Sequence, residues 1–107
     1  MKNIHQYWVY VMANGWRNVI YIGITNNLYI RYLQHKTGVV EGFTKKYKCH
    51  HLIYYEEYTY IEDAIRREKE LKGWRREKKM RLIRQQNPLL KDLAAELGWN
   101  EIPPSSE

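Results

Sequence analysis

The chain has 107 residues, of which 44% are hydrophobic and 28% are charged. This length suits one domain and is too short for two ordinary ones, and the composition excludes disorder of most of the chain. Lys and Arg outnumber Asp and Glu by 18 to 12, which gives a net charge of +6. No apolar stretch reaches the ~20 residues of a membrane-spanning helix, and residues 1–6 have no hydrophobic segment typical of a signal peptide. We therefore expect a cytoplasmic protein without membrane contacts.

The first elements that the sequence predicts are two strands joined by a turn. Residues 7–12 and 19–24 are two runs of apolar and aromatic residues rich in β-formers, and an Asn-Gly pair at 14–15 is a turn signal between them. Symmetric pairing about this turn places Tyr10 opposite Tyr21. Other registers of the same parity shift the pair but keep both phenols on one face of the sheet.

Helical and extended patterns follow the hairpin. Asn27 and its neighbours offer N-cap side chains to a helix over 28–36, which ends before Gly38. The order ββαβααα predicts an α+β fold, a small antiparallel three-stranded sheet flanked by helices. We assign residues 1–98 to the domain and 99–107 to a tail. The other elements are a connection at 37–48, a strand at 51–57, a helix from about 60 to 73, a basic helix at 74–86, and a short helix at 89–97 with Asn87 as its N-cap.

Positive charge is concentrated in residues 66–84, which hold ten basic and three acidic side chains. Such a field attracts polyanions, so we expect nucleic acid as the partner. The alternative is an ordinary solvated helix surface. Lipid headgroups are disfavoured, because the segment lacks a broad apolar face. The residues predicted to bind nucleic acid are Lys45 and Lys46 in the connection and Arg75, Arg76, Lys78 and Lys79 in the basic helix.

Glu68 lies on the apolar stripe of the helix at 60–73. Helical spacing places it between Ala64 and Ile65 in projection, in the middle of the expected buried face. Buried acids are nearly always paired or metal-bound. Glu68 is therefore either one half of a structural ion pair or a ligand for a hard divalent cation.

Two more pairs of polar side chains are placed for chemistry. Arg31 and His35 are four residues apart on one helix face, where a guanidinium suits phosphate oxygens and an imidazole can relay a proton. The alternative is an exposed Arg with a half-buried His. Tyr10 and Tyr21 share a sheet face, although tyrosines there are more often core residues.

Cys49 is the only cysteine, which excludes an intrachain disulfide and a zinc site of several thiolates. Residues 49–51 (Cys-His-His) combine metal-ligand types. Consecutive residues in a strand point to opposite faces, however, so we do not expect them to bind zinc together.

The order and spacing of these residues resemble the GIY-YIG nuclease family, in particular its small stand-alone members related to the incision domain of bacterial nucleotide-excision repair and to certain homing endonucleases. Residues 21–23 (Tyr-Ile-Gly) match the second signature in full. Residues 8–10 (Trp-Val-Tyr) keep the tyrosine of the first signature but have Trp8 in place of its glycine. Residues 42–47 are similar to a segment that recurs in the stand-alone members. The resemblance covers the chain from about Tyr7 to Leu93.

The resemblance implies roles for the residues that match. Glu68 would hold one Mg²⁺ or Mn²⁺ beside the scissile phosphate, and Arg31 would contact a phosphate oxygen. Tyr10 would take a proton from water, with Tyr21 and His35 orienting or relaying. An ordinary phenol has a pKa near 10, so Tyr10 needs help from the metal or from Arg31.

We accordingly expect a metal-dependent endonuclease that acts on nucleic acid, with DNA favoured over RNA. Asn87 matches a recurrent Asn near the family's site, so we also expect it to contact nucleic acid, although a helix cap explains it equally well. The alternatives are a nucleic-acid-binding module without catalysis, which has no need of an acid at Glu68, and a nuclease that is active only with a partner protein.

Overall fold

A three-stranded antiparallel sheet forms the centre of the molecule. The structure, a computed structural model, describes residues 6–38 and 42–99. The strands are β1 (Tyr7–Ala13), β2 (Ile20–Thr25) and β3 (His51–Tyr58), in the spatial order β2-β1-β3. The central strand β1 is the most apolar run of the sequence, and it is buried from Val9 to Ala13. Strand β2 therefore lies at one edge of the sheet and β3 at the other.

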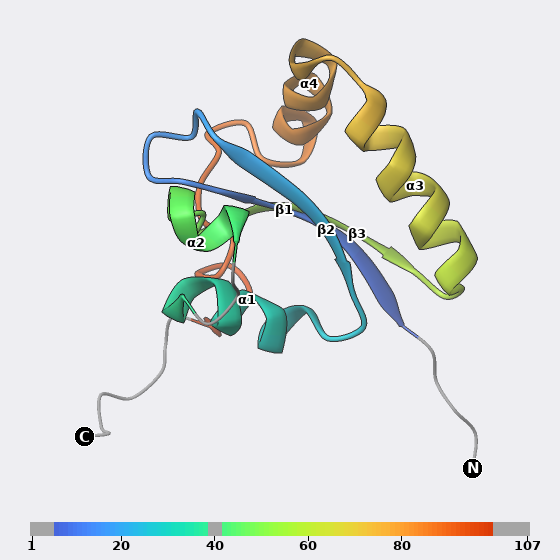
Figure 1. The fold of residues 1–107 in the computed structure, drawn as a ribbon, viewed down its shortest axis with the longest axis horizontal. Coiled ribbons are helices and arrows are strands. Elements are labelled where there is room, and N and C mark those ends of the chain that lie inside the picture. The colour runs from blue at the N-terminus through green and yellow to red at the C-terminus, as the bar shows by residue number, and fades with distance from the viewer. Residues whose placement is uncertain (1–5, 39–41, 100–107) are drawn as a thin grey trace.

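Helices cover both faces of this sheet. Figure 1 shows α3 (Ile61–Gly73) and α4 (Arg76–Gln86) on one side, and α1 (Leu28–Thr37) and the short α2 (Phe43–Tyr47) on the other. The predicted fold class, an α+β fold with a small antiparallel sheet flanked by helices, is confirmed. The three strands and the three longer helices follow one another in the predicted order. None of the helices in the described part of the chain is long and apolar enough to cross a bilayer.

The ends of α1 are fixed by the residues that the sequence indicates. The side chain of Asn27 accepts a hydrogen bond from the backbone N–H of Ile30, as an N-cap does. Gly38 ends the helix with a φ of 78°, a left-handed conformation that glycine adopts without steric cost. These two caps set which side chains of α1 face the sheet.

The register of the hairpin differs from symmetric pairing about Asn14-Gly15. Tyr10 pairs with Gly23, and Tyr21 pairs with Met12. The side chain of Asn14 accepts hydrogen bonds from the backbone N–H groups of Asn18 and Val19, which produces a longer turn than a two-residue one. The pairing is thereby shifted by two residues, so both phenols stay on the same face.

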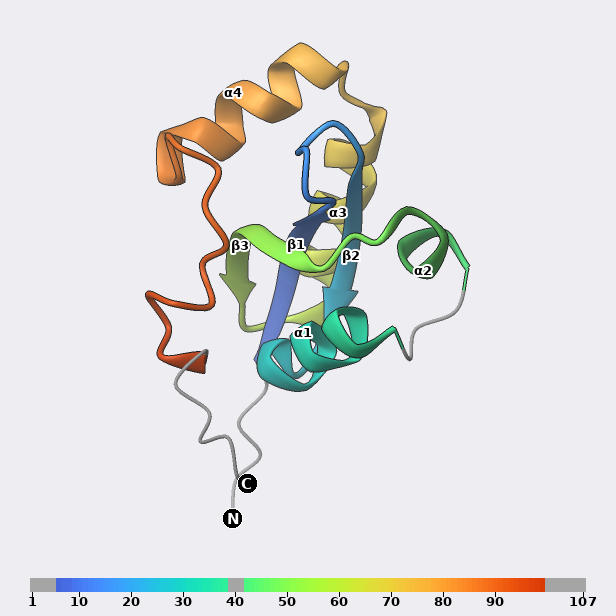
Figure 2. The ribbon, with the colours of Figure 1, turned by 90° about the vertical axis from the view of Figure 1, so that its left-hand side faces the viewer.

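Two predicted segments have a different conformation. The connection at 37–48 contains α2, a helix that was not predicted, and the helix expected at 89–97 is a series of turns. Leu93 is buried there and donates its backbone N–H to the carbonyl of Leu52, so the sheet rather than a helix satisfies it. Figure 2 shows this segment running along the β3 side of the sheet.

Asn87 is the C-cap of α4 and not the N-cap of a further helix. It is buried, and its amide donates to the carbonyls of Ile53 and Lys91 and accepts from the backbone N–H of Lys91. These hydrogen bonds give Asn87 a structural role, and that role explains why an Asn occupies this position. Its predicted contact with nucleic acid stays a prediction without support from this geometry.

The two faces of the sheet bury separate cores. Ala64 and Leu71 of α3 belong to the core between α3 and the sheet, whereas Ile61 and Ile65 are each 39% exposed. The buried face of α3 is thus rotated away from the predicted stripe. Glu68 consequently lies at the margin of the buried face and not in its middle, with 19% of its side chain exposed.

Candidate active site

Tyr10, Tyr21 and His35 form an aromatic cluster on the α1 face of the sheet. The Tyr10 hydroxyl lies 3.0 Å from His35 Nε2. The ring centroids of Tyr10 and Tyr21 are 6.3 Å apart, and each centroid is 5.6 Å from that of His35. Strands β1 and β2 supply the two phenols and α1 supplies the imidazole, so the fold brings together residues far apart in the sequence.

Gly23 makes room for this cluster. A Cβ atom at position 23 would lie 2.6 Å from the hydroxyl oxygen of Tyr10 and 2.9 Å from the ring of Tyr21. Both distances are shorter than carbon atoms tolerate, so only glycine allows the Tyr10 ring to lie over β2. The motif marks Gly23 in the sequence, but its steric reason becomes visible only in the structure.

Arg31 places a positive charge next to the hydroxyl of Tyr10. Its guanidinium Nη1 donates a hydrogen bond to the Tyr10 hydroxyl at 3.4 Å. Burial nevertheless raises the pKa of Tyr10 to about 12, with further contributions from the charges of Tyr21 and Glu68, while Arg31 opposes the rise. Tyr10 is therefore an uncharged phenol at neutral pH, and it can accept a proton only after nearby positive charge has favoured its phenolate form.

His35 is buried and uncharged at neutral pH. Burial, together with the positive charges of Arg31 and His50, lowers its pKa to about 4. A neutral imidazole can orient the Tyr10 hydroxyl through Nε2. Its Nδ1 has no hydrogen-bond partner within the described part of the chain. His50 was not among the residues predicted to surround this site.

Glu68 reaches the cluster electrostatically from the opposite face. Its negative charge contributes to the raised pKa of Tyr10, so α3 places the carboxylate within electrostatic reach of the phenol. Its carboxylate also accepts an ion pair from Lys72 Nζ at 2.9 Å, four residues along α3. This ion pair matches the structural alternative for Glu68.

A divalent ion at this position would have one protein carboxylate. No group of three or more His, Cys, Asp or Glu side chains suited to a metal occurs in the described residues. Mg²⁺ commonly binds through one or two carboxylates, water and substrate phosphates. The single, partly exposed carboxylate of Glu68 fits this kind of site, and its ammonium partner shows that a cation can be held there.

Two lysines flank Tyr21 at the edge of the sheet. A hollow of about 300 Å³ is lined by Tyr21 with Ile20 and Ile22 of β2 and by Lys72 and Lys79 of α3 and α4. Both lysines therefore contribute positive charge to the hollow beside Tyr21. Lys79 is among the residues predicted to bind nucleic acid, whereas Lys72 is not.

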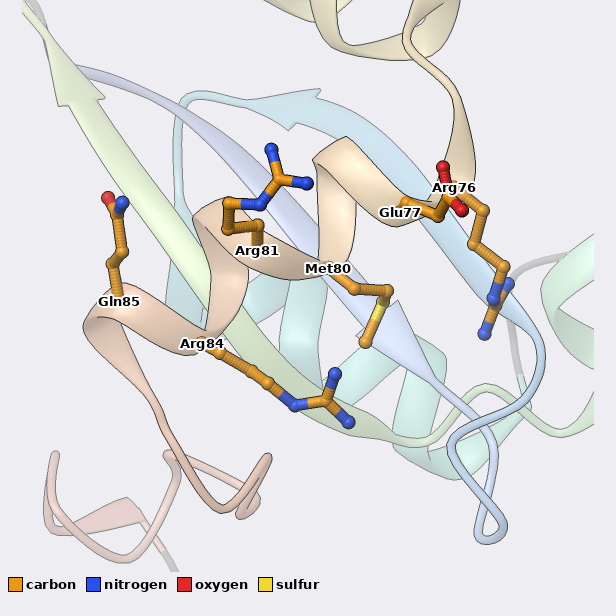
Figure 3. Close-up of a pocket in the computed structure, with 6 residues that line it drawn as sticks. All are labelled: Arg76, Glu77, Met80, Arg81, Arg84 and Gln85. Atoms are coloured by element: carbon orange, nitrogen blue, oxygen red, sulfur yellow. The ribbon is translucent and has the colours of Figure 1, made fainter.

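The other basic residues that were predicted to bind nucleic acid lie on α2 and around the start of α4. Arg75, Arg76 and Lys78 are exposed around the start of α4, and Lys45 and Lys46 are exposed on α2. The side chains of Arg76, Met80 and Arg84 extend from one side of α4 and line a hollow of about 650 Å³ (Figure 3). Arg76 donates to the carbonyl of Arg17 in the β1–β2 turn, and Lys78 Nζ lies 4.2 Å from the Trp74 ring centroid, so these two also support the fold.

Comparison of the sequence with known proteins identifies the family. A sequence profile described as the GIY-YIG catalytic domain matches residues 6–81. Two Staphylococcus aureus proteins, UPF0213 protein SAV0488 of strain Mu50 and UPF0213 protein SA0446 of strain N315, are each 35% identical to the chain over 66 residues, which is 62% of this chain and 80% of theirs. No solved structure gives a significant match. The chain therefore belongs to the GIY-YIG family, a family of nucleases that act on nucleic acid.

Proposed function

We propose that the chain is a divalent-metal-dependent endonuclease that hydrolyses phosphodiester bonds in DNA. The observation that supports this most is the meeting of Tyr10, Tyr21, Arg31 and His35 in one cluster, with Glu68 acting electrostatically on the same phenol. A protein that only binds nucleic acid has no use for a buried phenol between a guanidinium and an imidazole. The cluster also lies beside the lysine-lined edge of β2.

The side chains divide the hydrolysis among them. Tyr10 acts as a phenolate, after its own proton has passed to solvent: it takes the proton of the water that attacks phosphorus, the bond from phosphorus to the 3′ oxygen breaks, and the leaving oxygen takes a proton from solvent. Arg31 stabilises the charge that develops on the phosphate oxygens. The neutral imidazole of His35 holds the Tyr10 hydroxyl in place, and Tyr21 packs against both rings.

Glu68 would hold one Mg²⁺ or Mn²⁺, which supplies positive charge to the scissile phosphate and to the leaving oxygen. That charge is also what Tyr10 requires, because burial raises its pKa to about 12 in the absence of substrate. For the carboxylate to become a metal ligand, the ammonium of Lys72 has to leave it. Lys72 and Lys79 then face phosphates of the bound strand beside Tyr21.

The second candidate is a nucleic-acid-binding module without catalysis. Its support is the ion pair with Lys72, which gives Glu68 a structural role that needs no metal. A nuclease that is active only with a partner protein is a third outcome.

Glu68→Gln distinguishes these candidates, because it removes the charge but keeps the size of the side chain. We expect the melting temperature to stay within a few degrees and cleavage to fall at least about a hundredfold, since each ~1.4 kcal/mol of lost transition-state stabilisation is tenfold in rate. Glu62→Gln, an exposed position at the start of the same helix, is the matched control. The substrates are labelled single-stranded, duplex and branched DNA with their RNA equivalents, in Mg²⁺ and in Mn²⁺.

The outcomes separate cleanly. A stable Glu68→Gln protein that cuts at the parental rate removes Glu68 from the site. A protein that unfolds, and whose activity falls only with the folded fraction, supports the structural ion pair. A parental protein that binds all substrates and cuts none favours the binding module or the need for a partner, which adding cell extract to the assay distinguishes.

A further inference from the structure

A further hollow lies on the same face of the sheet as the aromatic cluster of Tyr10, Tyr21 and His35. It has a volume of about 460 Å³, within the range of small-molecule pockets. Of the ten described residues that line it, four are aromatic and four carry amide or carboxylate side chains. The residues that matter here are Trp8, Tyr29, Tyr55 and Trp99 in the wall, and Gln6 and Glu57 at the rim.

The hollow is next to the cluster but separate from it. Trp8 precedes Tyr10 by two residues on β1, so the two side chains leave the same face roughly 7 Å apart. Tyr10 leans over β2, whereas the hollow extends to Tyr55 on β3. Helix α1 contributes to both, because Tyr29 lines the hollow and Arg31 donates to Tyr10. A nucleic-acid strand that lies across the first turns of α1 would therefore pass from the hollow to the aromatic cluster.

The wall of the hollow is held in place by the fold. The ring centroid of Trp99 lies 5.2 Å from that of Tyr29 and 5.3 Å from that of Tyr32. The backbone N–H and carbonyl of Tyr55 are both hydrogen-bonded to the side chain of Gln86. Side chains fixed in this way lose little further entropy when a flat ligand stacks on them.

We propose that this hollow binds one unpaired nucleobase of the substrate strand, an inference that rests on the proposed nuclease function. Aromatic walls stack with any base, and base–aromatic stacking is the usual source of affinity for single-stranded nucleic acid. At the rim, the amide of Asn26 hydrogen-bonds to a base edge, and the Glu57 carboxylate, which already accepts from Gln6 Nε2, has a second oxygen that accepts from a base amino group. The substrate is therefore a strand with an unpaired nucleotide close to the scissile phosphate.

The lining of the hollow argues for a base over the other groups of a nucleotide. Among the described residues, those that line it include Glu57 but no lysine or arginine, so phosphate is repelled from it. Phosphates bind instead at the β2 edge, where Lys72 and Lys79 supply positive charge. A cationic side chain of another protein is the rival occupant, because aromatic rings with a carboxylate also attract cations.

The test measures binding in EDTA, so that no cleavage occurs. The ligands are a fluorescent single-stranded DNA octamer and the same octamer with abasic sites in place of its four central nucleotides. Parental protein should bind the octamer with bases about tenfold more tightly than the abasic one. Trp99→Ala and Tyr55→Leu should each reduce this ratio to about one while binding the abasic octamer as the parental protein does. Trp16→Ala, at an 89% exposed position in the β1–β2 turn, should keep the tenfold ratio.

Melting temperatures of all variants show that the folded proteins are being compared. An equal ratio in the parental protein and in both wall variants overturns the proposal, and so does loss of the ratio in Trp16→Ala alone. Tighter binding of an arginine-rich peptide than of the octamer, abolished in Trp99→Ala, assigns the hollow to the rival occupant. A base-dependent ratio in a protein that cuts no substrate, with or without cell extract, overturns the nuclease function and leaves the base site standing, so the two failures are distinguishable.

Discussion

Tyr10 and Gly23 are paired across the β1–β2 ladder, and a Cβ atom at position 23 would lie 2.6 Å from the Tyr10 hydroxyl oxygen. A side chain there has to push the phenol away from His35 and Arg31. Gly23→Ala should therefore lower cleavage at least about tenfold and also lower the melting temperature, because Tyr10 is almost completely buried.

Gly15→Ala is the control for this substitution, since a Cβ at position 15 meets no atom within 4 Å. It should cut at the parental rate. Cleavage rates and melting temperatures of both variants, compared with the parental protein, check the relationship. A Gly23→Ala protein with parental activity would contradict the placement of Tyr10 at the reacting centre.

His35 gives stability a pH dependence of known sign. Its pKa of about 4 in the folded protein lies below its ordinary value near 6.5, so the unfolded state binds more protons between these two pH values. The stability that His35 contributes is present above pH 6.5 and is lost as the pH falls toward 4. The melting temperature of the parental protein should drop over this window, and the drop should be smaller in His35→Gln. An equal drop in both proteins would show that His35 is not a buried neutral group.

The sequence predicts the sheet and the longer helices because their signals are local. The apolar run of β1, the caps Asn27 and Gly38 and the basic pattern of α4 each depend on neighbouring residues. The sequence leaves the register of the hairpin open among pairings of one parity, because the register depends on how the Asn14 side chain binds the turn. The segment at 89–97 has helical spacing, but Leu93 hydrogen-bonds to β3, and no local pattern encodes that contact.

The candidate site was predicted through motif residues, and its surroundings were not. Tyr10, Tyr21, Arg31 and His35 converge as their shared site requires. The orientation of α3 was missed, since Ile61 and Ile65 continue an apolar stripe that the sheet does not cover. Packing against the sheet determines which face of α3 is buried, and the periodicity of the sequence alone leaves that face open.

Glu56 should be a stability residue and not a site residue. It lies on the α3 face and accepts hydrogen bonds from Tyr54, Tyr58 and Arg67, with Arg67 Nε 2.9 Å from Oε1. Burial alone would raise its pKa, but these three donors outweigh burial and lower it. The corresponding stability is present above the ordinary carboxyl pKa and is lost as the pH falls below it.

Glu56→Gln should accordingly reduce the free energy of unfolding by about 2 kcal/mol at pH 7, since hydrogen bonds to a charged group are worth about 1.5–3 kcal/mol each and the amide keeps some of them. Urea denaturation measures this change. Cleavage per folded molecule should stay parental, because Glu56 hydrogen-bonds to Tyr54, Tyr58 and Arg67, none of which is a proposed catalytic residue. A folded variant that has lost its activity would contradict this assignment.

Lys72 should compete with a divalent ion for Glu68. Its ammonium occupies the carboxylate at 2.9 Å, so Lys72→Met should bind Mn²⁺ several-fold more tightly than the parental protein in the absence of nucleic acid. Lys69→Met removes the same charge from another position on the same helix and controls for the general electrostatic effect. Calorimetric titration with Mn²⁺ compares the three proteins. Equal affinity in all of them would mean that the ion does not bind at Glu68.

The β2 edge should provide much of the electrostatic affinity for nucleic acid. Lys79 lines the hollow beside Tyr21, and Arg75 is exposed just before α4. Charge reversal of both residues should weaken binding to all DNA sequences alike. It should also reduce the slope of log affinity against log salt by ~0.7 to 0.9 for each phosphate that the protein no longer neutralises.

Lys91→Glu is the control for this reversal, because Lys91 is exposed in the segment that runs along β3, at the other edge of the sheet. It should change the slope little, although it alters the net charge by the same amount as each of the other two reversals. Fluorescence anisotropy at several salt concentrations in EDTA gives affinity and slope together. If the double reversal at Arg75 and Lys79 leaves both unchanged, the basic surface of α4 is only solvated, and the strand has to reach Tyr10 along the α2 side, where Lys45 and Lys46 are exposed.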